Sequence, residues 1–345
     1  MRSPSRLPIL ALAGVLLVAA CNGGGASPSS EPAPSLGGSL TVYAGRSEEL
    51  VGPLIERFET ETGVTVEVDY AGTTDLAATI LEEGEASPAD VFFAQDAGAL
   101  GAVAAEGRLA TLPTTTLDKV DARFRSDDGQ WVGASGRARV VVYDSRVLDE
   151  GDLPTSIDAF TDPAWKGRIG WAPTNASFQS FVTAYRIVKG DEAAKAWLEG
   201  IVANEAKVYE GNDAILAAVA AGEVEVGFAN HYYLLQAIAE QGDTFPVRNH
   251  FLAGDDPGSL INVAGVGILT TSRNPSAAQA FVDFLLSAES QAYFSTETHE
   301  YPLIDGVDAD PALPPLADIA SPDIDLSDLS DLEGTLQLLQ DAGVL

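Results

Sequence analysis

Hydrophobic and polar positions follow one another along the chain in the order that is typical of strands alternating with helices. Residues 39–46 alternate as a short strand, and residues 47–63 carry apolar side chains at helical spacing from Leu50 to Phe58. The same order then continues as a strand over 64–72, a helix over 73–84, a strand over 89–96 and a helix over 97–107. This β-α-β-α-β order predicts a parallel sheet with right-handed crossovers.

The pattern changes at residues 131–148, where a β-branched run from Val140 to Tyr143 predicts a long strand that crosses between two lobes. The elements expected after it are a strand, turn and helix over 165–190, a helix over 191–204, a strand over 206–212, a helix over 213–223, a strand over 223–228, a helix over 234–240, a return strand over 259–271 and a helical pair over 274–298. The predicted fold class is therefore α/β, with two lobes that each have a sheet and that are joined by crossing strands.

We assign residues 39–139 and 264–312 to lobe 1 and residues 140–263 and 313–345 to lobe 2, with hinges near 137–143 and 260–266. Ligands of such folds bind at the carboxyl ends of strands and near helix N-termini. The loops that should meet in the cleft between the lobes are "YAGRS", "AGTTD", "AQDAG", "PTNAS", "YEGND" and "NHYY".

The first residues predict export and a lipid anchor. Residues 1–20 carry two arginines, an apolar run and small residues, as a secretory signal does, and Val18, Ala19 and Ala20 before Cys21 resemble a bacterial lipobox. Cys21 is the only cysteine, so it is expected to be the lipidated first residue of the mature protein. The Gly-, Ser- and Pro-rich residues up to 38 would form a flexible linker. The protein is therefore expected outside the cytoplasm, attached to the cell membrane.

The formal net charge of −32 argues against nucleic acid and anionic membrane surfaces as partners. It is compatible with the collection of cations, but an acidic surface also serves general solubility. Much of the acid lies in the tail-like stretch 304–334.

Two adjacent tyrosines, Tyr232 and Tyr233, stand where the strand 223–228 passes into a helix. Adjacent side chains on a strand point to opposite faces, but at a strand-to-helix turn they can converge. A free phenol has a pKa near ~10, and a hard, highly charged cation can replace its proton. Asn230 is expected to cap the helix and orient the turn. The alternative for the two tyrosines is ordinary packing with a partner for each hydroxyl.

The body of the chain resembles the periplasmic ferric-ion-binding proteins, a branch of the type II solute-binding fold. The stretches that carry the resemblance are "LTVYAGRSEEL", "SPADVFFAQDAGAL", "SGRARVVVYDSRVL", "WKGRIGWAPTNASF", "NHYYLL" and "EYPL". The resemblance implies that Tyr232 and Tyr233 bind Fe(III) with a synergistic anion, phosphate or carbonate. It also implies a monomer that performs no chemistry and delivers the ion to the permease of an ABC importer.

Two further ligands of the best-matching branch are absent here. Its histidine corresponds to Ser47, and its glutamate corresponds to Gln95, which Asp96 follows. Gln95 could coordinate through its amide oxygen, and Asp96 or Glu48 could substitute after a local shift. Gln95 and Asp96 could equally form a solvated cleft rim, and Glu48 suits the start of a helix.

The positions that contact the anion in this family have matching residues here, unlike the positions of the histidine and the glutamate. Backbone N–H groups and a hydroxyl point outward from a helix N-terminus, which favours an anion there, although the same geometry serves simple capping. The residues expected to contact the anion are Asn175, Ala176, Ser177, Asn212, Asn230 and Arg46.

Two other functions compete with ferric-ion capture. A binding protein for an anionic small molecule, such as a phosphonate or a phosphate ester, is the alternative because the histidine and the glutamate are missing. A secreted hydrolase is disfavoured, since the sequence has neither a nucleophile elbow nor an H-E-x-x-H motif.

Overall fold

The computed structural model describes residues 36–252 and 254–345. The expected signal sequence and the lipidation site Cys21 lie outside the described residues. Within the described ranges, no helix combines the length and the apolar character needed to cross a membrane.

The strands are β1 Ser39–Ala44, β2 Thr65–Tyr70, β3 Val91–Ala94, β4 Val132–Asp144, β5 Ile169–Trp171, β6 Lys207–Val208, β7 Val226–Asn230, β8 Val247–His250 and β9 Ile261–Ile268. The helices are α1 Glu48–Thr62, α2 Thr73–Glu83, α3 Ala97–Ala105, α4 Thr114–Leu117, α5 Ala176–Lys189, α6 Asp191–Ala203, α7 Asn212–Ala221, α8 Tyr232–Gln241, α9 Pro275–Leu285, α10 Ala288–Thr296 and α11 Leu332–Asp341. The alternating order predicted from the sequence is confirmed; α4, β8 and α11 were not predicted.

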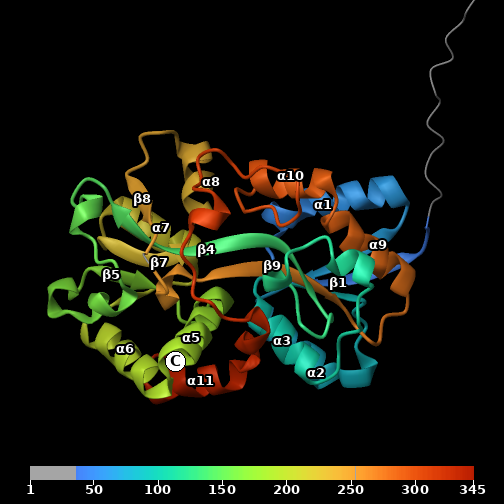
Figure 1. Cartoon of the computed structure of the whole chain (residues 1–345), viewed down its shortest axis with the longest axis horizontal. Coiled ribbons are helices and arrows are strands. Elements are labelled where there is room, and N and C mark those ends of the chain that lie inside the picture. Colours follow the sequence, from blue (N-terminus) through green and yellow to red (C-terminus); the bar gives the residue numbers. More distant parts are fainter. Residues whose placement is uncertain (1–35, 253) are drawn as a thin grey trace, which may run out of the picture. The chain divides into compact units, whose positions relative to one another are not determined.

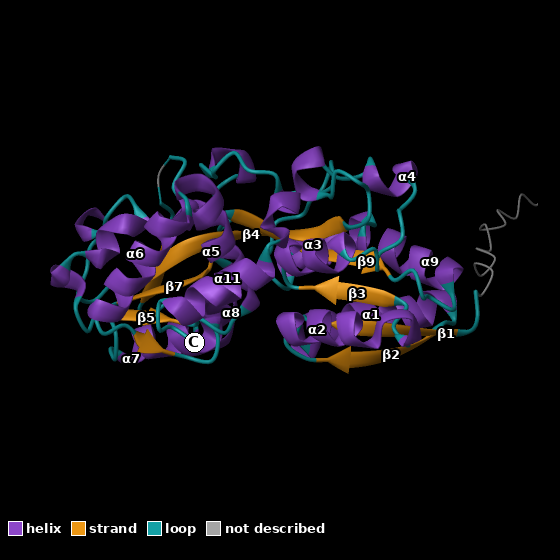
Figure 2. Ribbon diagram, turned by 90° about the horizontal axis from the view of Figure 1, so that it is seen from below, coloured by secondary structure: helices purple, strands orange, loops and turns teal. Residues whose placement is uncertain are grey.

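Strand β4 joins the two halves of the body. The strand order among the described residues is β2-β1-β3-β9-β4-β7-β5-β6, with β8 pairing with β4. Residues 132–138 of β4 pair with β9, whereas residues 139–144 pair with β7 and β8. In Figures 1 and 2, β4 runs as one long curved ribbon through both halves. The halves therefore share β4, where the sequence led us to expect a separate sheet in each lobe.

Each half has its own hydrophobic core. In lobe 1, α1, α2, α3 and α9 cover the β1–β2–β3–β9 sheet with residues such as Phe58 and Phe281. In lobe 2, Phe178 and Trp197 lie in a cluster on one side of the sheet, and α7 packs on the other side. Fully burying a side chain of this size contributes about 1.5–3 kcal/mol. The chain therefore has two cores, joined by strands that run between them.

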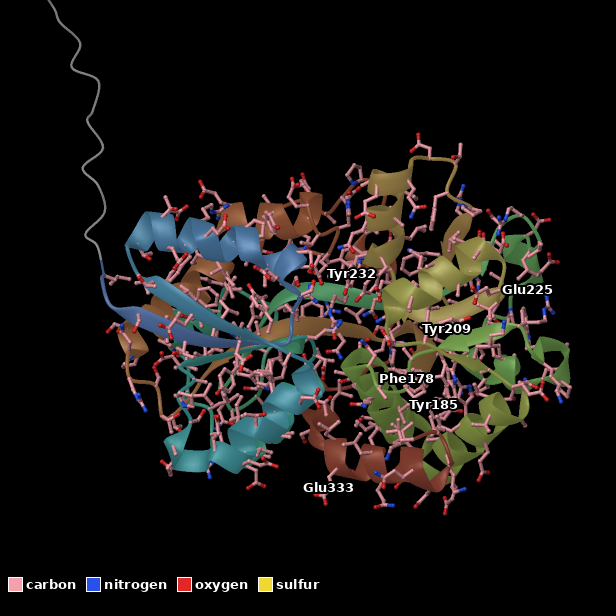
Figure 3. All side chains as sticks on the ribbon, turned by 180° about the vertical axis from the view of Figure 1, so that it is seen from behind. Phe178, Tyr185, Tyr209, Glu225, Tyr232 and Glu333 are labelled. Carbon is pink, nitrogen blue, oxygen red and sulfur yellow. The ribbon has the colours of Figure 1, made fainter. Side chains whose placement is uncertain are left out.

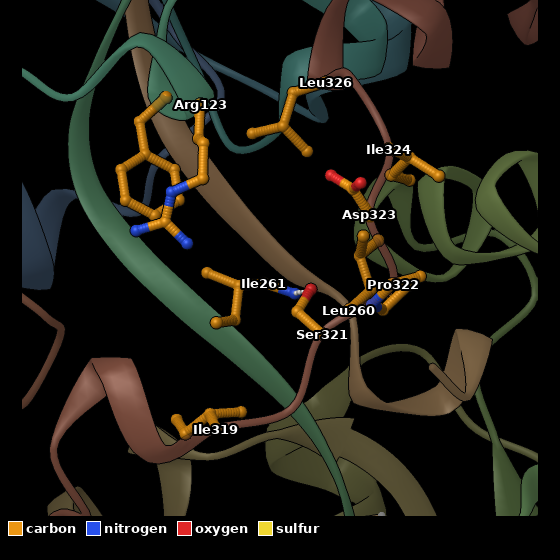
Figure 4. A pocket seen from close by; sticks show the side chains of 10 residues that line it. Arg123, Leu260, Ile261, Ile319, Ser321, Pro322, Asp323, Ile324 and Leu326 are labelled. Atoms are coloured by element: carbon orange, nitrogen blue, oxygen red, sulfur yellow. Dashed lines mark hydrogen bonds between the residues drawn. The ribbon is translucent and has the colours of Figure 1, made fainter. Parts of the chain in front are cut away.

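The C-terminal segment spans both lobes. Leu326 and Leu329 pack in the core of lobe 1, whereas Leu339 of α11 packs in the core of lobe 2. Before that point the segment follows β9, where the hydroxyl of Ser321 accepts a hydrogen bond from the backbone N–H of Ile261 at 3.1 Å (Figure 4). The sequence assigned residues 313–345 as a whole to lobe 2, and the lobe boundaries stay a prediction.

His231 ties three segments together at the crossing point. Its Nδ1 accepts a hydrogen bond from the backbone N–H of Ala138 at 3.1 Å, and its Nε2 lies 3.0 Å from the carbonyl oxygen of His299. Nδ1 is therefore the acceptor and Nε2 carries the proton, which makes the ring neutral. Burial lowers the pKa of His231 to about 4.

Gly101 of α3 lies directly under the C-terminal segment, and we expect Gly101→Ala to destabilise the fold. A Cβ atom at this position would lie 2.9 Å from the Cβ of Ser330. Overpacking of this kind costs roughly 1–3 kcal/mol, which exceeds the helix-propensity gain of about 1 kcal/mol. Urea unfolding measures the change. Gly52→Ala in α1 is the control, because its Cβ would meet only the flexible side chain of Glu48 at 3.5 Å. Equal effects of the two substitutions would contradict the close contact.

The neutral state of His231 predicts a loss of stability in acid. Between pH 6.5 and pH 4 the unfolded chain binds a proton that the folded chain does not, so the free energy of unfolding falls as pH decreases through this window. The slope from this group is at most about 1.4 kcal/mol per pH unit. Urea unfolding at pH 7.5, 6.5, 5.5 and 5.0 should show a shallower slope in His231→Gln, and His250→Gln is the matched control. A slope unchanged in His231→Gln would refute this assignment.

Candidate metal-binding site

The tyrosine pair begins α8 without an intervening loop. All five residues of β7 are buried, and α8 starts at Tyr232, two residues earlier than the sequence indicated. The N-cap position belongs to His231, whose side chain makes no capping hydrogen bond. The expected capping role of Asn230 is therefore wrong: Asn230 is the last residue of β7 and pairs with Arg139 of β4.

The two phenols converge, as expected for a strand-to-helix junction. Their rings are stacked, with centroids 4.3 Å apart and planes at 26°. Tyr232 is fully buried, yet its hydroxyl has no hydrogen-bond partner among the described residues. Burial, and then the neighbouring Tyr232, raise the pKa of Tyr233 well above its ordinary value, while Arg46 and Arg137 oppose the increase. Figure 3 shows Tyr232 in the central part of the body, between the two lobes.

Both tyrosines line a cavity of about 340 Å³ that has walls from both lobes. Its lining residues are Gly45, Arg46, Ser47, Leu50, Tyr70, Ala71, Gln95, Asn175, Tyr232 and Tyr233. A neighbouring cavity of about 350 Å³ shares Gly45, Gln95 and Asn175 with it and extends to Glu210. Each of the six loops expected to meet in the cleft contributes at least one residue to these two cavities, and "AQDAG" contributes Gln95.

Arg46 belongs to a buried ion pair next to Tyr232. Its Nη2 donates to both carboxylate oxygens of Glu300 at 2.8 Å, and its guanidinium carbon lies 5.9 Å from the ring centroid of Tyr232. Glu300 also accepts hydrogen bonds from the hydroxyls of Ser135 and Thr298, each at 3.1 Å. Arg46 therefore lines the cavity as expected, but a carboxylate already holds it in place.

The structure separates the two candidate ligands that follow β3. Gln95 lines both cavities, and its backbone is fixed because its N–H donates to the hydroxyl of Thr73 at 3.0 Å. Asp96 lines neither cavity. It is buried as the N-cap of α3, where Oδ1 accepts from the N–H of Ala99 at 3.0 Å and from the hydroxyl of Ser180 at 2.6 Å. Burial raises the pKa of Asp96 in spite of these hydrogen bonds.

The residues expected to hold an anion are grouped around the start of α5. Asn175 is the N-cap, and its Oδ1 accepts from the N–H of Ser177 at 3.0 Å and from its hydroxyl at 2.6 Å. The amide of Asn212, the first residue of α7, reaches the same oxygen at 3.4 Å. Asn175 and Ala176 line a cavity, whereas Ser177 and Asn212 are buried behind them. Asn230 is buried on β7, where its amide nitrogen has no partner among the described residues.

Two further arginines are buried where β4 crosses between the lobes. Arg137 donates to the carbonyl oxygens of Gln95 and Val263, and Arg139 donates to that of Ser177 at 3.2 Å. Neither forms an ion pair with a carboxylate of the described residues. Burial, and then the nearby Arg137, lower the pKa of Arg139 to about 9. Both guanidinium groups therefore lie in the interior of the protein.

The sequence did not single out Tyr70, Glu300 or the contact between Thr74 and Gln179. Tyr70 adds a third phenol to the cavity. The hydroxyl of Thr74 in lobe 1 donates to Oε1 of Gln179 in lobe 2 at 2.9 Å. The position of Tyr70 at the end of a predicted strand was the one available signal, because strand ends face the cleft in this fold. No three His, Cys, Asp or Glu residues of the described ranges gather into a group that could hold a metal ion.

Comparisons with known proteins agree with this architecture. Residues 53–320 match the family model of a bacterial extracellular solute-binding protein. The major ferric iron-binding protein of Neisseria meningitidis is 37% identical over 311 residues, which cover 88% of this chain and 93% of that protein. The crystal structure of iron-bound HitA from Pseudomonas aeruginosa has 36% identity and a TM-score of 0.85, and the match covers 88% of this chain and 99% of that one.

A structure from Trichodesmium in complex with iron and citrate ligands has 28% identity and a TM-score of 0.76, and the match covers 89% of this chain and 100% of that one. The family match and the two-lobed α/β architecture show that this chain is a bacterial extracellular solute-binding protein of type II fold. The identity to the curated relatives shows that it belongs to the periplasmic ferric-ion-binding protein family.

Proposed function

We propose that this protein captures Fe(III), together with a synergistic anion, in the cavity lined by Tyr232 and Tyr233 and delivers it to an ABC importer. The observation that carries the proposal is the hydroxyl of Tyr232, which is fully buried without a hydrogen-bond partner in the described part of the chain. An unsatisfied buried hydroxyl costs about 1–3 kcal/mol. A metal ion that replaces its proton would remove this penalty and would bind the stacked Tyr233 at the same time.

The surroundings of the two tyrosines support a hard, highly charged cation. Phenolate oxygen is an anionic donor, and binding requires the loss of one proton from each phenol. Arg46 and Arg137 oppose the high pKa of Tyr233 and so favour its ionised form. Gln95 can add an amide oxygen from the other wall of the cavity.

The N-terminus of α5 supports an anion as the partner of the metal. Asn175 lines the tyrosine cavity and caps a helix of fourteen residues. The unsatisfied N–H groups and the dipole of such a helix start favour negative charge. Phosphate, carbonate or citrate would then occupy coordination positions that protein side chains leave open.

The remaining parts of the proposal concern the cell. A lipidated Cys21 would hold the body near the membrane through the linker, where the permease of the importer receives the ion. The protein would act as a monomer and would catalyse no reaction. A binding protein for a phosphonate or a phosphate ester is the alternative, and the absorption spectrum after addition of Fe(III) distinguishes the two.

Replacing both tyrosines should abolish iron binding. Tyr232→Phe/Tyr233→Phe removes the two phenolate oxygens but keeps the stacked rings, so the fold should remain and the affinity for Fe(III) should fall at least about a hundredfold. The measurement is the visible phenolate-to-iron charge-transfer band during titration with Fe(III) and phosphate. Tyr209→Phe is the matched control, because Tyr209 lines neither of the two cavities. A double variant that binds iron as the natural chain does would refute the proposed function.

Removal of anions should also weaken binding. Tyr232, Tyr233 and Gln95 supply fewer donors than Fe(III) prefers, so buffer free of phosphate, carbonate and citrate should lower the affinity sharply. Ser177→Asp should have a similar effect, because a carboxylate at the start of α5 repels the anion. Ser287→Asp is the control, since Asp can keep the N-cap of α10. Unchanged affinity in anion-free buffer would show that other protein donors complete the metal site.

A further inference from the structure

Tyr70 is a third phenol in the cavity that contains Tyr232 and Tyr233. It is the last residue of β2 and pairs with Ala44, the last residue of β1. The two strands are parallel, so their carboxyl ends open together toward the cleft. Tyr232 and Tyr233 enter the cavity from lobe 2, and Tyr70 enters it from lobe 1.

The side chain of Tyr70 is available for a ligand. It shares a strand face with Val66 and Val68, which pack against the core of lobe 1, and it lies at the cleft end of that row. Tyr70 is half-buried, and its hydroxyl makes no hydrogen bond to any other described residue. The ring is therefore fixed by packing while its oxygen is left without a protein partner.

A second lobe 1 residue of the cavity, Ser47, has a short side chain. Ser47 lines the same cavity from the loop after β1, and its short side chain makes no capping hydrogen bond at the start of α1. A phenol from the end of the next strand can use this space.

The charge around Tyr70 favours a cation. Burial, and then the carboxylates of Glu48, Glu49 and Glu56, raise the pKa of Tyr70, so the wall formed by the start of α1 is negative. Each phenolate ligand adds one anionic oxygen donor to Fe(III). A third phenolate would therefore leave less positive charge for the exogenous anion to balance.

We propose that Tyr70 is a third phenolate ligand of the bound metal, supplied by lobe 1 opposite Tyr232 and Tyr233. This inference rests on the proposed function. It gives the metal an anionic protein donor from each lobe, so that the ion itself would hold the lobes together.

The test uses the full chain titrated with Fe(III) and phosphate, and compares Tyr70→Phe, Tyr70→His and the control Tyr209→Phe. In Tyr70→Phe the charge-transfer intensity should fall by about a third, the share of one phenolate in three. Resonance Raman spectra should show a matching loss of tyrosinate bands. EDTA should remove the iron at least about tenfold faster than from the natural chain. Tyr209→Phe should change none of these readings.

Restoring a metal donor by a second substitution distinguishes a role of Tyr70 as a ligand from a role in packing. Tyr70→His supplies another donor, so it should slow the removal of iron relative to Tyr70→Phe while the tyrosinate signal stays low. Ser47→His in the Tyr70→Phe background should do the same from the neighbouring position. Unchanged charge-transfer intensity in Tyr70→Phe would overturn the inference, whether or not iron is removed faster. If Tyr232→Phe/Tyr233→Phe still binds iron, the proposed function fails instead.

Discussion

The antiparallel pairing along β4 fixes the positions of both walls of the cleft. Residues 132–138 belong to the sheet of lobe 1 and residues 139–144 to that of lobe 2, so one strand sets the register of both. Arg139 pairs with Asn230 at the end of β7, and this pairing places the tyrosines immediately after the crossing point. Two residues earlier, Arg137 donates to the carbonyl oxygen of Gln95 on the opposite wall. The distance between the two walls therefore depends on a few neighbouring residues of a single strand.

The charge inside the cleft differs from the charge of the whole chain. The formal net charge is −32, but exposed charges are screened over about 8 Å at physiological ionic strength. Arg137 and Arg139 are buried, where screening is weak, and they have no carboxylate partner within the described ranges. Arg46 is balanced by Glu300. The buried guanidinium groups thus favour anionic groups next to them, in a protein whose net charge is strongly negative.

Hydrophobic patterning predicted most of the fold, because both sheets are largely buried and their helices have clear apolar faces. The loops that line the cavities were also predicted correctly, because the ends of parallel strands meet at one edge of a sheet. The capping role of Asn230 was wrong because the backbone of β7 continues through Asn230 and the helix begins directly at Tyr232. The burial of Arg137 could not be predicted, because its partners are backbone carbonyls brought together by tertiary structure. The same holds for Glu300, which lies 254 residues from Arg46.

Contacts between the lobes bear on the proposed metal site, which has few protein donors. The hydroxyl of Thr74 donates to Gln179 at 2.9 Å, and that of Ser180 donates to Asp96 at 2.6 Å, so two hydrogen bonds join the lobes without involving the ligand. Each contributes about 0.5–1.5 kcal/mol, and the bond to a carboxylate can contribute more. A ligand shifts the lobes toward the closed state only by the difference between its affinities for the two states. Because these two hydrogen bonds already join the lobes, an ion bound as proposed needs to supply less of the free energy that holds them together. The proposed function is therefore compatible with Ser47 and Gln95 at the positions where the family that the sequence resembles has a histidine and a glutamate.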